Sequence, residues 1–158
     1  LVPGDGTSDF SSNRWHHQFH KINTFPEELI KGREKLYLKY FYENWSGKEF
    51  TMEKDAQNKY LKAYAIEEIM KSGFEYYRAL PQDIDDNIEF LKKGKLHTPF
   101  LGIAGKDGYG RGIEIILNSL NRITNNFEGY EISSAGHWVA EEEPELAAKY
   151  ILEFFNKN

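Results

Sequence analysis

A histidine in a loop that favours a sharp turn is the strongest candidate for catalysis. The segment Ser133–Trp138, with the sequence SSAGHW, follows a predicted strand and precedes an acidic run at 141–145. His137 would then lie at the C-terminal edge of a parallel sheet, where open α/β folds bind their ligands. Gly136 allows the sharp turn, and imidazole is a natural base near neutral pH. The alternative is a loop histidine that only caps the sheet.

An acidic residue follows the other predicted strand. Asp107 lies in Gly105–Gly110, with the sequence GKDGYG. A carboxylate there could orient His137 through a ring N–H, as a catalytic triad requires. An ordinary Asp-Gly turn explains the same residues. Both interpretations stay open.

Three histidines gather close to Trp15, at positions 16, 17 and 20. His16 and His20 have the i, i+4 spacing that a zinc site on a helix can use. The glutamate of a His-Glu-x-x-His motif is absent, however, and the chain has no cysteine. We therefore expect no metal site and favour a histidine that donates a hydrogen bond into a pocket.

Two tyrosines stand side by side in Gly73–Ala79, with the sequence GFEYYRA. Adjacent helical residues point about 100° apart, so at most one of Tyr76 and Tyr77 faces a given pocket. A phenol can donate a hydrogen bond to a developing oxyanion. Aromatic packing is the alternative for either residue.

The composition excludes several classes of function. Without cysteine, the chain can form neither disulfides nor a thiolate nucleophile. The net charge of −5 comes without a concentrated basic stripe, so we expect no nucleic-acid partner. No apolar run is long enough to span a bilayer, so we expect no membrane partner. Nothing indicates a cofactor.

The periodicity predicts a helical region followed by alternating strands and helices. We expect helices at 26–45, 51–64, 66–80 and 83–91, with Pro81 between the last two. Strands at 99–105 and 127–134 should alternate with helices at 112–124 and 142–155. This order predicts an α/β fold with a parallel sheet. Two parallel strands are too few for a stable sheet, so we expect further strands elsewhere.

The four motifs described above occur in an order that resembles the epoxide-hydrolase-like branch of the α/β-hydrolases, and the resemblance covers residues 10–156. The residues that carry the resemblance are Trp15-His16, Phe25–Glu34, Tyr64-Ala65, Phe74–Ala79, and Gly136-His137-Trp138 with the acidic run after it. The chain also resembles fluoroacetate and haloalkane dehalogenases. The resemblance implies the C-terminal portion of an α/β-hydrolase fold. Residues 1–14 would be a linker from a missing N-terminal core, 15–94 a helical cap, and 95–158 the C-terminal part of the core.

The resemblance also implies a two-step reaction on a small-molecule substrate, an epoxide or a halogenated compound. An aspartate attacks an epoxide carbon and forms an ester, which water activated by a histidine then hydrolyses. By this resemblance His137 is the base, Tyr77 the preferred cap donor with Tyr76 as second choice, and His16 the other donor. Trp15 and Trp138 would be substrate neighbours.

The chain departs from the family pattern in its missing nucleophile. It contains no Gly-x-Asp-x-Gly segment and no His-Gly-x-Pro segment. We expect an incomplete piece that is inactive alone and needs a missing N-terminal segment or a second chain. The triad acid is either upstream of Leu1, which we prefer, or Asp107. The alternatives are a haloacid or haloalkane dehalogenase, a self-associating homo-oligomeric binding module that covers its sheet edge, and a metal-binding helical protein.

Overall fold

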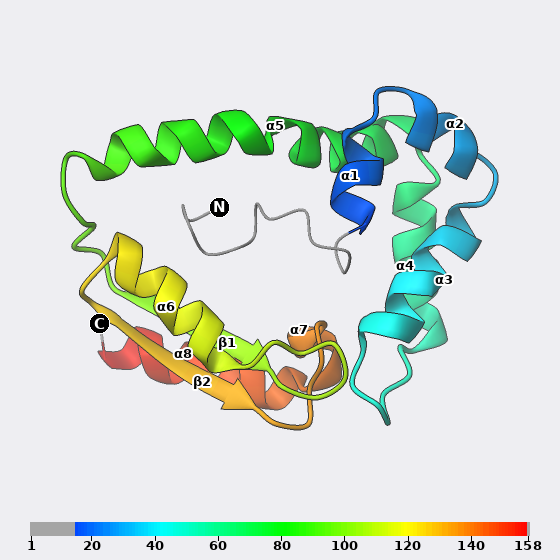
Figure 1. Cartoon of the computed structure of the whole chain (residues 1–158). Coiled ribbons are helices and arrows are strands. Elements are labelled where there is room, and N and C mark those ends of the chain that lie inside the picture. Colours follow the sequence, from blue (N-terminus) through cyan, green and yellow to red (C-terminus); the bar gives the residue numbers. More distant parts are fainter. Residues whose placement is uncertain (1–14, 158) are drawn as a thin grey trace.

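The computed structural model describes residues 15–157, and a part made only of helices comes first along the chain (Figure 1). The predicted linker at 1–14 lies outside the described residues. The helical part comprises α1 (Trp15–Lys21), α2 (Phe25–Ile30), α3 (Glu34–Trp45), α4 (Lys54–Tyr64) and α5 (Glu67–Leu91). Its core is Ile30, Met70 and Phe74, with Phe19, Tyr37 and Tyr64 packed against them.

The second part alternates strands and helices, as predicted. Its elements are β1 (Phe100–Gly105), α6 (Ile113–Ile123), β2 (Phe127–Ile132), α7 (Val139–Glu142) and α8 (Pro144–Lys157). The change from helices to strands falls between 91 and 100, close to the predicted boundary at 94. That the two parts are separate domains remains a prediction.

The single helix predicted over 26–45 is wrong. Gly32 has a φ of +76°, which interrupts the helical backbone between α2 and α3. Glycine adopts this left-handed conformation without the steric cost that a side chain brings. The break lets α2 and α3 run in different directions (Figure 1).

The break predicted at Pro81 is also wrong, because α5 runs through that residue. A proline inside a helix removes one backbone N–H, here the donor that would reach the carbonyl of Tyr77. Such a loss weakens or bends a helix without having to end it. In contrast, Pro144 does mark a boundary: Glu143 leaves the helical conformation, with a φ of −138°, and separates α7 from α8. The residue before a proline is biased away from helical backbone.

The two strands pair in parallel, as the sequence predicts, in register from Phe100 with Phe127 to Gly105 with Ile132. Gly102 and Gly129 are register partners, and an added Cβ at either would meet α6 side chains. Side chains alternate between the faces of a strand. Tyr130 therefore points to the other face, where it stacks on Tyr150 of α8 with ring centroids 4.1 Å apart. The helices α6 and α8 thus cover opposite faces.

The end of β1 is packed too tightly for any side chain. A Cβ on Gly105 would lie 2.0 Å from the carbonyl oxygen of Gly136 and 2.4 Å from that of Ala135. Both atoms belong to the backbone of the loop that carries His137. Relief of the clash would have to move that loop away from the sheet.

We expect Gly105→Ala to lower the free energy of unfolding by about 2 kcal/mol or more, because the clash is with backbone. Gly73→Ala is the matched control. Gly73 lies inside α5, and the nearest atom to its added Cβ is 3.8 Å away on Tyr64. This control should be neutral or stabilise by roughly 0.5–1 kcal/mol. Urea unfolding measures both; equal losses of stability would contradict the assigned packing.

Candidate functional site

The loop that carries His137 is held by one carboxylate. Glu142 accepts backbone hydrogen bonds from Gly136 at 2.8 Å and Trp138 at 2.9 Å, which flank His137. It also accepts one from Gly47, at 2.7 Å, in the loop after α3. Hydrogen bonds to an ionised acceptor are stronger than neutral ones. Glu142 therefore connects the helical part of the chain to the loop after β2.

A direct backbone contact strengthens the same connection. The backbone N–H of His137 donates to the carbonyl of Trp45, the last residue of α3, at 2.9 Å. Gly136 packs so closely that an added Cβ would lie 2.4 Å from the backbone nitrogen of Gly47. The position of His137 is thus fixed relative to the end of α3.

Aromatic rings surround the His137 side chain on several sides. Its ring centroid lies 4.9 Å from those of Trp45 and Trp138 and 5.9 Å from that of Tyr109. As a whole, His137 is still an exposed residue of the described chain. Partial removal from water by these neighbours lowers the pKa of His137, and Arg111 adds to the effect while Glu142 opposes it. A lowered pKa leaves a neutral imidazole, the form that accepts a proton.

Asp107, the other predicted triad member, interacts with Lys48. Its carboxylate accepts the backbone N–H of Lys48 at 2.6 Å and forms an ion pair of 3.7 Å with the Lys48 ammonium. The hydrogen bond from the Lys48 backbone holds the pKa of Asp107 below its usual range. In the part of the chain that the structure describes, no hydrogen bond joins the Asp107 carboxylate to His137. The geometry therefore does not bring these two predicted triad members together.

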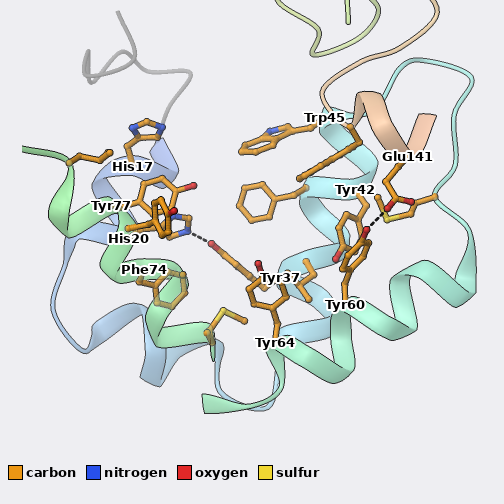
Figure 2. A pocket seen from close by; sticks show the side chains of 18 residues that line it. His17, His20, Tyr37, Tyr42, Trp45, Tyr60, Tyr64, Phe74, Tyr77 and Glu141 are labelled. Atoms are coloured by element: carbon orange, nitrogen blue, oxygen red, sulfur yellow. Dashed lines mark hydrogen bonds between the residues drawn. The ribbon is translucent and has the colours of Figure 1, made fainter. Parts of the chain in front are cut away.

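A pocket of about 640 Å³ lies among α1, α3, α4 and α5, next to the loop of His137 (Figure 2). Its walls are mostly aromatic. The lining residues are His17, His20, Tyr37, Leu38, Phe41, Tyr42, Trp45, Met52, Tyr60, Tyr64, Met70, Gly73, Phe74, Tyr76, Tyr77, Leu80, Trp138 and Glu141. His137 contacts two of them, Trp45 and Trp138. The candidate base is therefore beside this pocket.

Two hydrogen-bonded pairs mark opposite sides of the pocket (Figure 2). On one side the hydroxyl of Tyr37 is bonded to Nε2 of His20, and on the other the hydroxyl of Tyr60 donates to Glu141. Burial, with His16, His17 and Arg78 nearby, lowers the pKa of His20 to about 3. Burial also raises the pKa of Tyr37. The pair His20–Tyr37 is therefore uncharged near neutral pH.

The structure brings the predicted donors His16 and Tyr77 together. Their ring centroids are 5.9 Å apart, and His16 is buried against Trp45 at 4.8 Å. Contrary to the expectation that at most one of them faces the pocket, both Tyr76 and Tyr77 line it. Tyr77 is partly buried, whereas Tyr76 is 77% exposed and lies at its rim, so the burial favours Tyr77 as the donor. Of the two predicted tryptophans, Trp138 lines the pocket, and Trp15 packs on Tyr40 and Phe41.

Sequence reasoning missed three residues that organise this region: Trp45, Tyr60 and Glu142. Trp45 ends α3 with no motif around it, and Tyr60 pairs with a glutamate that is 81 positions away. Glu142 lies in the acidic run at 141–145, where nothing in the sequence distinguishes one glutamate from the next. Within the described range 15–157, no group of three potential ligands is arranged to hold a metal ion. No helix in that range is long and apolar enough to cross a membrane.

Searches by sequence found no matching family model and no matching curated protein. Solved structures do match. ALR0039 of Nostoc sp PCC 7120, a candidate α/β hydrolase, has a TM-score of 0.82 at 24% identity over 98% of this chain and 55% of its own. The epoxide hydrolase CorEH has a TM-score of 0.79 at 23% identity over 99% and 56%. Cfl2 of Burkholderia cenocepacia has a TM-score of 0.78 at 24% identity over 98% and 50%.

This chain spans about half the length of the structures that it matches. The matched half contains both the helical part and the strand–helix–strand–helix part, since nearly all of this chain is covered. At these identities the likeness concerns the fold. The chain therefore has the fold of the C-terminal portion of an α/β hydrolase, with neighbours that include an epoxide hydrolase.

Proposed function

We propose that this chain carries the water-activating base and the oxyanion donors of an epoxide hydrolase. The observation that supports this proposal best is that the candidate base and one of the candidate donors pack against the same ring, that of Trp45. The ring centroid of Trp45 lies 4.9 Å from that of His137 and 4.8 Å from that of His16, and the His16 ring packs against Tyr77. A base beside an aromatic pocket, one donor, Tyr77, that lines it and a second, His16, packed against Tyr77 suit a two-step ring opening.

In the first step, an aspartate from outside these 158 residues attacks an epoxide carbon. The C–O bond breaks, an ester forms, and the negative charge develops on the epoxide oxygen. Tyr77 and His16 donate hydrogen bonds to this oxygen, which stabilises the developing charge. The raised pKa of Tyr77, caused mainly by burial, keeps its hydroxyl protonated as a donor.

In the second step, neutral His137 accepts a proton from water, and the hydroxide formed attacks the ester carbonyl. The bond between the carboxyl carbon and the diol oxygen then breaks. The two diol oxygens take one proton from the His137 imidazolium and one from the hydroxyl that was added to the carboxyl group, so the aspartate is restored as a carboxylate and the net reaction adds one water to the epoxide. Haloalkane chemistry uses the same ester and remains the second candidate by resemblance. A haloacid is less favoured, because the lining residues among 15–157 include a carboxylate and no lysine or arginine.

We expect His137→Gln to trap the ester in the enzyme that includes its aspartate, because the first step does not need the base. Intact-mass spectrometry after incubation with an epoxide should show an adduct equal to the whole epoxide mass. A haloalkane would instead add its mass less that of the hydrogen halide. Absence of any adduct, with the fold retained, would contradict the role of His137 and the aspartate mechanism together.

We expect Tyr77→Phe to slow ester formation by about 10²-fold, because it removes one oxyanion donor. Hydrolysis of the ester should change little. Tyr40→Phe is the matched control: it removes the same hydroxyl from an exposed tyrosine that is not among the described lining residues of the pocket, and it should leave both steps unchanged. Single-turnover kinetics separate the two steps. Slower ester hydrolysis with normal ester formation would rule out the assigned role of Tyr77.

A further inference from the structure

One side of the pocket combines aromatic rings with a carboxylate. Glu141 lies there with Tyr42, Tyr60 and Trp138, all of which line the pocket. The ring centroid of Tyr42 is 6.1 Å from that of Tyr60 and 5.9 Å from that of Trp138. The planes of Tyr42 and Trp138 meet at 71°, so these rings form two adjoining walls.

The charge of Glu141 lacks a cationic partner in the described part of the chain. Its carboxylate accepts a hydrogen bond from the hydroxyl of Tyr60, a neutral donor, and takes part in none of the salt bridges among the described residues. The adjacent Glu142 differs, because three backbone N–H groups surround its carboxylate. No lysine or arginine is among the described lining residues of the pocket.

Tyr42, on the same side of the pocket, keeps its hydroxyl protonated. Burial raises the pKa of Tyr42 to about 12, and Tyr60, Tyr64 and Glu141 add to the effect. Tyr42 therefore stays a neutral ring at all physiological pH values. Neutral aromatic faces beside a carboxylate attract positive charge, since the π face of a ring is electron-rich.

We propose that this side of the pocket binds a substituted ammonium group of the substrate. The Tyr42, Tyr60 and Trp138 rings contact the alkyl groups on nitrogen, and Glu141 supplies the opposite charge. Aromatic cages recognise quaternary ammonium ligands in this way. The inference rests on the proposed function in one respect, namely that the substrate occupies this pocket, and it narrows the substrate class to amine-bearing compounds.

The arrangement of the pocket suits an elongated ligand. Tyr77 and His20 lie on one side of it, and Tyr60 and Glu141 lie on the other (Figure 2). A ligand whose ammonium group rests beside Glu141 would extend its other end towards Tyr77. The reacting oxygen and the charge of the ligand are then bound by different groups, which fixes its orientation.

The test compares choline with 3,3-dimethylbutan-1-ol, a neutral analogue of the same shape in which carbon replaces nitrogen. Isothermal titration calorimetry on the full chain measures both affinities, and quenching of tryptophan fluorescence reports binding near Trp45 and Trp138. We expect choline to bind at least about tenfold more tightly, which corresponds to about 1.4 kcal/mol. Equal affinities, or no binding of choline, would overturn the proposal.

Glu141→Gln tests the role of the charge and preserves an acceptor for Tyr60. We expect the preference for choline to fall to about threefold or less, with the affinity for the neutral alcohol unchanged. Glu145→Gln makes the same charge change at an exposed position in the first turn of α8 and should keep the full preference. Unchanged discrimination in Glu141→Gln would show that the carboxylate has no part in recognition.

This experiment is independent of turnover, since binding needs neither His137 nor an aspartate. A preference for choline without an ester adduct in His137→Gln would leave the ammonium site standing and remove the proposed reaction. An ester adduct without a preference for choline would support the proposed reaction and remove the ammonium site. The two proposals can therefore fail separately.

Discussion

The site depends on the carboxylate of Glu142, which accepts three backbone hydrogen bonds. Two come from the residues on either side of His137, and one comes from Gly47, 95 positions earlier in the chain. These backbone donors would lose their partner if the carboxylate were removed, at a cost of about 1–3 kcal/mol for each one left buried and unsatisfied. Without this interaction, the helical part would lose a major contact with the loop that carries the candidate base.

Small residues make this interaction possible. Gly47, Gly105 and Gly136 lie at positions where an added Cβ would approach backbone atoms within 3.0 Å. The end of β1, the loop after α3 and the loop after β2 can therefore come into direct backbone contact. A side chain at one of these positions would separate two of these segments and move His137 away from Trp45. The glycines are thus needed for positioning the imidazole as well as for the turns.

The sequence predicted those features that depend on local pattern. The order of helices and strands, the parallel pairing and the loop position of His137 follow from periodicity and from glycine and proline signals. The helix through Pro81 was not predicted, because a lost hydrogen bond can be tolerated when the flanking turns remain helical. The break at Gly32 depends on a positive φ, which many helical glycines never adopt.

Long-range contacts account for what the sequence could not predict at the site. Asp107 and His137 stand after neighbouring strands, an arrangement that suggested a triad, but Asp107 bonds to the backbone of Lys48. The loop after α3 had no recognisable signal, so its competition for this carboxylate could not be foreseen. The pairing of Tyr60 with Glu141 depends in the same way on how α4 packs near α7.

Trp45 connects these features, because its backbone and its ring act on different parts of the site. Its carbonyl accepts the N–H of His137, and its ring packs against both His137 and His16, with ring centroids 4.9 and 4.8 Å apart. Any rotation of α3 would therefore shift the candidate base and the candidate donor together. A site that catalyses two steps needs its base and its donor to be positioned together. The group that opens the epoxide ring and the group that hydrolyses the ester act on the same bound substrate.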